Sequence, residues 1–379
     1  MKKDFGKLSL ALHKKYHGKI ELLGKVAVKS RDDLSVTYTP GVGAVSSFLA
    51  LHKDKLRDYS IKRNTIAVIS DGSAVLGLGN IGPEGALPVM EGKALLFKSF
   101  ADVDAFPIVL DTQDTEEIIR TVRNIAPVFG GINLEDISAP RCFEIERRLK
   151  TELSIPVMHD DQHGTAMVVL AGLINAAKVV KKNLASAHIV ISGAGAAGTA
   201  VAELIHLYGV QDIVMLDSVG IISGNRTDLN DEKKKLLAFT NKTNKSGDLA
   251  FALEGADIFI GLSKAGLLSA DHIKMMSPKP IVFAMANPVP EVMPDVALKA
   301  GAAVIATGRS DFPNQLNNVL GFPGIFRGAL DHNVRDITNA MLIKAAKRLA
   351  ELVKKPTATN IIPSPFDKRV AKAVAASIR

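Results

Sequence analysis

Residues 156–165 read Pro-Val-Met-His-Asp-Asp-Gln-His-Gly-Thr, and the rest of the chain is organised around this stretch. A short apolar segment ends there in two adjacent carboxylates, Asp160 and Asp161, and an apolar segment of helical character follows at residues 166–180. Carboxylates between a strand end and a helix start are costly unless a cation neutralises them. We therefore expect a divalent metal ion at this junction.

A second acidic pair, Glu135 and Asp136, lies about one supersecondary unit earlier, and we expect both pairs to share the metal. Oxygen ligands without a cysteine favour Mg²⁺ or Mn²⁺. Two other interpretations remain open. His159 and His163 permit a zinc site, and Asp136 and Asp161 are suitable helix N-caps.

The pattern of apolar segments predicts an α/β protein of two domains. The strands expected before the acidic stretch are residues 65–70, 106–110, 130–134 and 155–158, with helices at 1–30, 44–51, 92–101, 115–125 and 140–153. Strands without polar alternation are typical of parallel sheets covered on both faces. We assign residues 1–163 to a parallel α/β substrate and metal domain.

Residues 164–379 repeat the alternation and predict a Rossmann-like, doubly wound dinucleotide domain with closing C-terminal helices. The strands expected there are residues 188–192, 213–216, 258–262, 281–284 and 303–306, and the closing helices are 336–352 and 369–378. The length of 379 residues agrees with two domains.

Composition excludes several classes of protein. The net charge of +8 is dispersed, and without Trp or basic strips interleaved with aromatics it does not indicate nucleic-acid binding. No uninterrupted apolar run of about 18 residues predicts a membrane span. The single cysteine, Cys142, excludes an intramolecular disulfide. We expect a cytoplasmic protein without a membrane partner.

Two stretches match the pattern G-x-G-x-x-G, one from Gly77 to Gly82 and one from Gly193 to Gly198. The second follows a predicted strand directly and opens an uninterrupted helix, which offers free N–H groups to a pyrophosphate. In the first, Pro83 and Pro88 interrupt the helix that should follow. We interpret the first as a glycine loop that brings the backbone close to another part of the protein. The second predicts the nucleotide site, Gly193, Ala194, Gly195, Ala196, Ala197 and Gly198.

Asp217 ends the next strand, where an acidic residue binds the ribose 2′-hydroxyl of NAD. No cation is adjacent in the sequence, which favours NAD over NADP. Arg226 is close enough in the chain to reach a 2′-phosphate, so NADP stays possible.

A metal and a nicotinamide in one cleft indicate oxidation and decarboxylation of a 2-hydroxy acid. A base must then remove the hydroxyl proton and an acid must protonate the enolate. Lys93 and Tyr38, each at a glycine-bounded turn, are candidates by position.

The chain resembles the malic enzymes of the short prokaryotic type. The motifs that carry the resemblance run in order along the chain: Tyr38-Thr39-Pro40-Gly41-Val42, Asp71-Gly72-Ser73, Leu78-Gly79-Asn80, Met90-Glu91-Gly92-Lys93, Asn133-Leu134-Glu135-Asp136, residues 159–165, residues 284–288 and residues 317–324. The resemblance implies oxidative decarboxylation of (S)-malate to pyruvate with NAD or NADP and Mn²⁺ or Mg²⁺, and a homodimer.

The resemblance also implies roles for particular residues. Tyr38 is the expected general acid and Lys93 the general base. The expected metal ligands are Glu135, Asp136 and Asp161, with Asp160 as a supporting neighbour and the histidines as structural residues. Substrate or nicotinamide contacts are expected from Asn287, from Asn318 and, less favoured, from Asn317.

One departure is visible. Longer relatives place a substrate-binding arginine just after the Asp-Gly of the glycine loop, where this chain has Ser73-Ala74-Val75. Another donor must therefore hold that carboxylate. Two alternative functions remain: an oxaloacetate decarboxylase on the same scaffold, and a nucleotide-sensing module with an inactive site.

Overall fold

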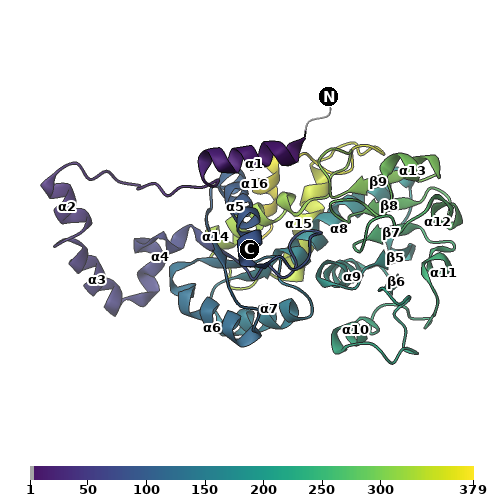
Figure 1. Cartoon of the computed structure of the whole chain (residues 1–379), viewed down its shortest axis with the longest axis horizontal. Helices are drawn as coiled ribbons and strands as arrows, with labels where there is room; N and C mark the ends of the chain where they lie inside the picture. The colour runs from purple at the N-terminus through teal and green to yellow at the C-terminus, as the bar shows by residue number, and fades with distance from the viewer. Residues whose placement is uncertain (1–3) are drawn as a thin grey trace.

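The computed structural model describes residues 4–379, and within them the strands form a four-stranded and a five-stranded sheet, both parallel (Figure 1). The predicted fold class, a parallel α/β domain followed by a Rossmann-like domain, is confirmed. The proposed division at residues 163 and 164 stays a prediction.

The first sheet has the order β2-β1-β3-β4. Its strands are β1 Thr65–Ser70, β2 Asp104–Val109, β3 Gly131–Leu134 and β4 Val157–His159. The order places β2 on one side of β1 and β3 on the other, so the chain reverses its direction of winding between β1 and β3. Side chains that follow β1 and β3 therefore converge at the carboxyl edge.

The second sheet has the order β6-β5-β7-β8-β9, with the same reversal between β5 and β7. Its strands are β5 His188–Ser192, β6 Asp212–Leu216, β7 Ile258–Gly261, β8 Ile281–Ala284 and β9 Val304–Thr307. All except the first residues of β5 and β6 are buried, as expected for strands covered by helices on both faces.

Helices cover both sheets. Those of the first half are α1 Phe5–Tyr16, α2 Arg31–Thr37, α3 Val42–Leu51, α4 Leu56–Tyr59, α5 Gly82–Ala101, α6 Thr115–Ile125 and α7 Arg141–Glu152. Those of the second half are α8 Asp160–Val180, α9 Ala196–Tyr208, α10 Asp231–Leu236, α11 Leu249–Leu253, α12 Ala270–Met275, α13 Pro294–Lys299, α14 Phe322–Asp331, α15 Asn339–Glu351 and α16 Arg369–Ala375. Short 3₁₀ helices are η1 Lys53–Lys55, η2 Ile61–Arg63, η3 Ala126–Val128, η4 Leu184–Ser186 and η5 Asn318–Leu320.

Helix α8 joins the two sheets, and its buried apolar side chains between Ala166 and Val180 belong to the main hydrophobic core. That core also includes β1, β5, α9 and the closing helices α14, α15 and α16, so the C-terminal segment packs back on both halves. The two sheets are therefore connected through a buried helix and a shared core.

Two helix predictions are wrong. Helix α1 ends at Tyr16, and residues 17–30 form no helix, because His17 adopts a left-handed conformation and Gly18 follows it. Helix α5 begins at Gly82, ten residues earlier than predicted. Pro83 sits in the first turn, where its missing N–H costs nothing, and Pro88 is accommodated inside the helix.

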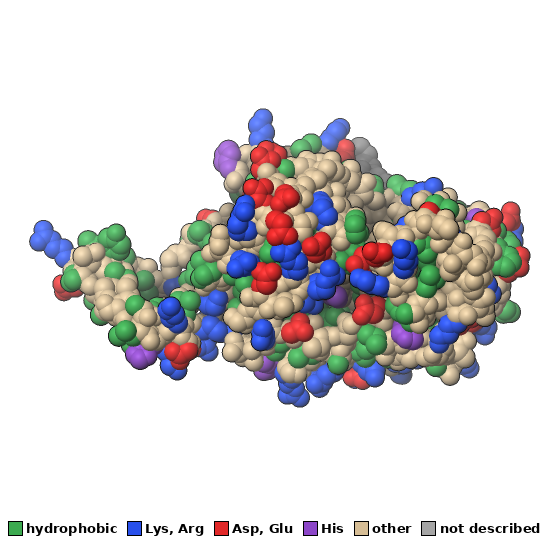
Figure 2. Space-filling model, turned by 90° about the horizontal axis from the view of Figure 1, so that it is seen from below, with side chains coloured by type: hydrophobic (Ala, Val, Ile, Leu, Met, Phe, Trp, Pro, Cys, Tyr) green, Lys and Arg blue, Asp and Glu red, His purple; other side chains and the backbone are tan. Residues whose placement is uncertain are grey.

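Helices α2 and α3 lie on an arm, residues 20–60, that projects from the body (Figure 1). Neither helix has a buried residue. Large apolar side chains on the arm are nevertheless exposed: Leu22, Leu23, Val26, Val28, Leu34, Val36, Tyr38, Leu51 and Tyr59. Figure 2 shows apolar side chains on the projecting arm, with charged side chains beside them.

Two helical segments are long and apolar enough to cross a membrane by length and composition alone, Arg31–Leu51 and Asp160–Val180. This differs from the expectation that the chain has none. The second segment is α8, a helix of the hydrophobic core with most of its residues buried. The first is divided into α2 and α3 by the turn at residues 38–41 and begins with Arg31, Asp32 and Asp33.

Candidate active site

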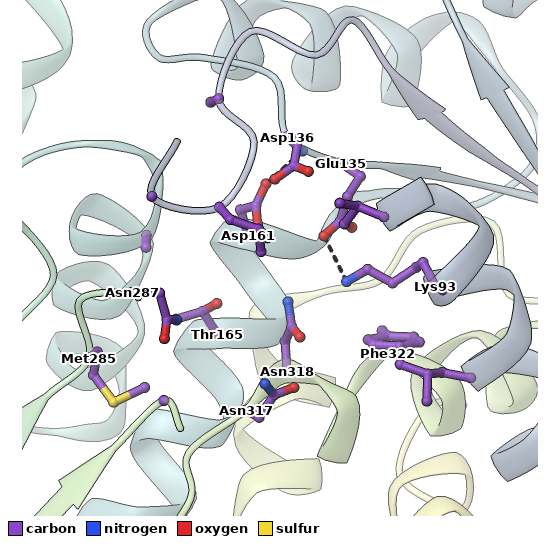
Figure 3. Close-up of a pocket in the computed structure, with 18 of the residues that line it drawn as sticks. Lys93, Glu135, Asp136, Asp161, Thr165, Met285, Asn287, Asn317, Asn318 and Phe322 are labelled. Carbon is purple, nitrogen blue, oxygen red and sulfur yellow. Dashed lines mark hydrogen bonds and ion pairs between the residues drawn. The ribbon is translucent and has the colours of Figure 1, made fainter. Parts of the chain in front are cut away.

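A cavity of about 650 Å³ lies between the carboxyl edges of the two sheets. Its lining brings together most of the residues predicted from the sequence: Lys93, Glu135, Asp136, Asp161, Ala197, Asn287, Asn317 and Asn318. Figure 3 shows the acidic residues and Lys93 on one side, with Asn287 and Met285 from the second sheet facing them. These segments are distant in sequence, so only the tertiary fold assembles the site.

The metal prediction depends on three carboxylates. Glu135 and Asp136 follow β3, and Asp161 lies in the first turn of α8 after β4. One oxygen from each lies within 4.8 Å of the others. Asp136 has a left-handed backbone, φ 53°, which is uncommon for a non-glycine residue. Its Oδ2 is buried and has no hydrogen-bond partner among residues 4–379.

The electrostatics of this cluster fit a cation. Burial, and next the charge of Asp161, raise the pKa of Asp136 to about 8. Burial likewise raises the pKa of Glu135 well above its usual value, although Lys93 opposes the shift. Such shifts mark an excess of buried negative charge. Three oxygen donors and an unpartnered carboxylate oxygen suit Mg²⁺ or Mn²⁺.

The structure does not support the two other interpretations of the acidic stretch. Neither His159 nor His163 belongs to the carboxylate cluster found in residues 4–379. The ring of His163 instead contacts Glu146 at 2.9 Å, and buried His159 lies 3.4 Å from Asp161. The N-caps of α7 and α8 are Pro140 and His159, so neither aspartate caps a helix.

Lys93 projects from α5 toward the acidic cluster and is only 7% exposed. Its Nζ lies 2.6 Å from Asp160 Oδ2, 2.7 Å from Glu135 Oε1 and 4.2 Å from the centre of the Phe322 ring. Burial favours the neutral amine, but the charges of Asp160 and Glu135 outweigh it and raise the pKa of Lys93.

Asp160 is therefore the partner of the lysine and lies outside the three-carboxylate cluster. Burial raises its pKa to about 6, against the opposing charge of Lys93. Gly164 makes room for it, since a Cβ at that position would lie 1.8 Å from Asp160 Oδ1. Close contact with the Asp160 side chain thus explains why residue 164 is a glycine.

Three asparagines enter the cavity from the second half of the chain. Asn317 uses its Oδ1 to accept a hydrogen bond from the Val319 amide at the start of η5. No hydrogen bond engages the Asn318 side chain within residues 4–379, and Figure 3 shows it directed toward the cavity below Lys93. Asn287 packs over Gly308, whose missing side chain leaves room for it. The preference for Asn318 over Asn317 agrees with this arrangement.

Tyr38 does not line the cavity of its own chain. It ends α2 on the projecting arm and is 67% exposed. The cavity therefore contains the expected base but not the expected acid.

The nucleotide fingerprint occupies the turn between β5 and α9. Gly193 has φ 115°, and a Cβ there would lie 2.5 Å from the Leu262 carbonyl oxygen. Gly195 leaves the first turn of α9 without a side-chain cap. A Cβ at Gly198 would lie 1.8 Å from the Gly193 carbonyl oxygen, so the third glycine permits close packing of helix on turn. The turn, with its free N–H groups, fits a pyrophosphate.

No cation adjoins Asp217 in the sequence, but the fold brings two cations to it. Arg226 binds both of its carboxylate oxygens, and Lys233 binds one at 2.6 Å. The sequence does not reveal that α10 directs the Lys233 side chain back toward Asp217 at the end of β6.

The first glycine pattern has the role predicted for it. A Cβ at Gly77 would lie 1.8 Å from the Asn287 carbonyl oxygen, so this loop contacts the second half of the chain beside the cavity. The interpretation as a loop of close backbone approach is confirmed.

Sequence reasoning missed residues near α1. Ser9, His13 and Lys19 line the cavity, and Lys19 Nζ donates to the Pro88 carbonyl oxygen at 2.6 Å. A Cβ at Gly92 would lie 3.2 Å from that Nζ, so the glycine before Lys93 admits a second lysine. The one signal for Lys19 in the sequence was the absence of the substrate-binding arginine of longer relatives, because another cation must then hold the substrate carboxylate.

Comparison with known proteins agrees with this site. Residues 17–150 match the family description "Malic enzyme, N-terminal domain", and residues 162–378 match "Malic enzyme, NAD binding domain". The bifunctional malic/malolactic enzyme of Bacillus subtilis (strain 168) is 55% identical over 373 residues, which cover 98% of this chain and 91% of the relative. The NAD-dependent malic enzyme of Geobacillus stearothermophilus is 56% identical, covering 94% and 75%.

The crystal structure of the NAD-dependent malic enzyme from Thermotoga maritima superposes with a TM-score of 0.94 at 49% identity, covering 97% of this chain and 98% of that one. Both halves of the chain, its sequence and its fold thus agree, and the chain belongs to the malic enzyme family.

Proposed function

We propose that this malic enzyme oxidises and decarboxylates (S)-malate to pyruvate and CO₂ in the cavity between the two sheets, with NAD as the preferred cofactor. The observation that carries the proposal is the convergence of Lys93 and the three-carboxylate cluster beside the glycine turn of the nucleotide domain. When bound, Mg²⁺ or Mn²⁺ would stabilise negative charge on the C2 oxygen, and NAD would accept the hydride.

Lys93 is the proposed base for the C2 hydroxyl proton. To act in this way it must first be neutral. The charges of Asp160 and Glu135 hold the proton on Lys93 and raise its pKa, so a divalent cation held by the carboxylate cluster would be needed to offset those charges and release the proton.

Asparagine and lysine side chains would orient the substrate. Asn318 and Asn287 supply amide donors on the nicotinamide side of the cavity. Lys19 is the cation that we assign to the carboxylate held by arginine in longer relatives, because it lines the cavity beside the turn of α5 that carries Lys93. An ammonium there would hold a carboxylate of malate by a charge-assisted hydrogen bond.

Tyr38 is the proposed acid that protonates the enolate, supplied by a second copy of the chain. Three features support this assignment: the cavity lacks Tyr38 of its own chain, the tyrosine is exposed, and the arm around it displays unpaired apolar side chains. An exchanged arm would bury those side chains and complete each cavity. The homodimer is then required for activity.

Initial rates test the function. Purified protein with malate, NAD and Mn²⁺ should produce NADH, and the rate should fall on chelation of the metal. CO₂ release from oxaloacetate without NADH from malate would establish the oxaloacetate decarboxylase instead. A nucleotide-binding module with an inactive site would bind NAD but turn over neither substrate.

A further inference from the structure

The Asp217 carboxylate at the end of β6 is fully occupied by the protein itself. Its Oδ1 accepts hydrogen bonds from the amides of Val219 at 2.9 Å and Gly220 at 3.3 Å and from Arg226 Nη1 at 2.8 Å. Its Oδ2 accepts from Arg226 Nη2 at 3.0 Å and from Lys233 Nζ at 2.6 Å. The side chain is only 6% exposed. No lone pair is left for a ribose hydroxyl while these contacts persist.

The guanidinium of Arg226 is equally occupied. Its Nε and Nη2 bind the Asp228 carboxylate, and its Nη1 also binds the Gly220 carbonyl oxygen. Arg226 therefore has no free donor, and Lys233 directs its charge at Asp217. Two cations that would suit a phosphate are held by carboxylates.

The cluster of Asp217, Arg226 and Lys233 lies where the adenosine ribose of the cofactor would bind, an inference that rests on the proposed NAD site. Strand β6 lies beside β5, whose glycine turn would hold the pyrophosphate. In doubly wound folds the adenosine ribose lies at the end of this neighbouring strand. A 2′-phosphate of NADP would therefore come close to Asp217, Arg226 and Lys233.

We propose that Asp217 selects NAD by withholding Arg226 and Lys233 from a 2′-phosphate, rather than by binding the ribose hydroxyls. A phosphate must compete with a buried carboxylate for both cations and is repelled by that carboxylate. The ribose hydroxyls of NAD need no such exchange. The two roles for Asp217 differ in what they predict when its carboxylate is removed. If Asp217 only withholds the cations, NADH affinity should stay nearly unchanged, whereas NADH affinity should fall if Asp217 binds the ribose.

The test measures the binding of NADH and NADPH to the whole chain in the absence of substrate and metal. Binding is monitored by nucleotide fluorescence or by calorimetry. The variant is Asp217→Ser, whose hydroxyl can still accept from the Val219 amide and which leaves space for a phosphate. We expect NADPH to bind at least about tenfold more tightly than to the wild type, because charge-assisted hydrogen bonds to both cations become available. We expect NADH affinity to change by less than about threefold.

A fall of tenfold or more in NADH affinity, without a gain for NADPH, would show that Asp217 is the ribose acceptor and overturn the proposal. Asp217→Ser combined with Arg226→Gln should lose the gain for NADPH, and retention of the gain would contradict the role of the arginine. If the serine variant does not fold, Lys233→Met in the otherwise unchanged chain provides the same decision. It frees one oxygen of Asp217, so NADH affinity should stay within about threefold, whereas a tenfold gain would show that the freed carboxylate binds the ribose and would refute the proposal. A wild-type chain that binds neither nucleotide would refute the proposed NAD site itself, and thus differs from these outcomes.

Discussion

Mixing two inactive variants tests whether each active site is built from two chains. Lys93→Ala removes the base, and Tyr38→Phe removes the phenol while it keeps the aromatic ring. Each should reduce the rate by at least about a hundredfold, which is typical for loss of an acid or base. If Tyr38 acts in the partner's cavity, a mixed dimer contains one cavity with both residues intact and one with neither.

The expected magnitude follows from this count. Random pairing makes about half of the dimers mixed, each with one working site of two, so the mixture should regain about one quarter of the wild-type rate. Co-expression with two different tags and isolation of the mixed dimer should raise this to about one half. The readout is the initial rate of NADH formation from malate with NAD and Mn²⁺.

A matched control pairs Lys93→Ala with Asp161→Asn. Both residues lie in the cavity of one chain, so no exchange of the arm can restore an intact site, and the mixed dimer should stay inactive. The reasoning is refuted if the tyrosine and lysine variants recover no activity on mixing. A wild-type chain that is monomeric and fully active by light scattering and rate measurement would refute it equally.

Three further predictions concern the cavity. Gly77→Ala places a methyl group 1.8 Å from the Asn287 carbonyl oxygen, so the loop must move and kcat/KM should fall about a hundredfold while the far-ultraviolet circular dichroism is unchanged. Asp136 has a raised pKa of about 8, so its negative charge destabilises the metal-free fold increasingly as the pH rises from about 4 to 8. Asp136→Asn should therefore raise the Tm measured in chelator, and by more at pH 8 than at pH 5. The same variant should abolish the increase in Tm that Mn²⁺ causes in the wild type. Lys19→Met should raise the KM for malate at least about tenfold with little change in NADH binding, and an unchanged KM would remove Lys19 from the substrate site.

Local patterns in the sequence determined the strands and the glycine turn. Apolar runs located the nine strands of residues 4–379 within a few residues, because parallel strands covered by helices on both faces have little solvent-exposed surface. Gly193 and Gly198 were identified from their spacing, since a tight turn before a helix excludes a Cβ at these positions. The acidic pairs pointed to the cluster of Glu135, Asp136 and Asp161, because buried carboxylates are costly without a cation, and its role as a metal site stays a prediction.

Tertiary structure alone decided which side chains meet. The predicted start of α5 was wrong because the helix contains two prolines and three glycines, which have low helix propensity. Packing of α5 against β1 and β2 overrides this low propensity. Lys19 and Lys233 were missed because their partners lie 69 and 16 residues away. Tyr38 is on an exposed arm, and no one-chain sequence pattern reveals whose cavity it enters. Sequence periodicity records which residues are buried within an element, whereas contacts between distant elements depend on how the whole chain packs.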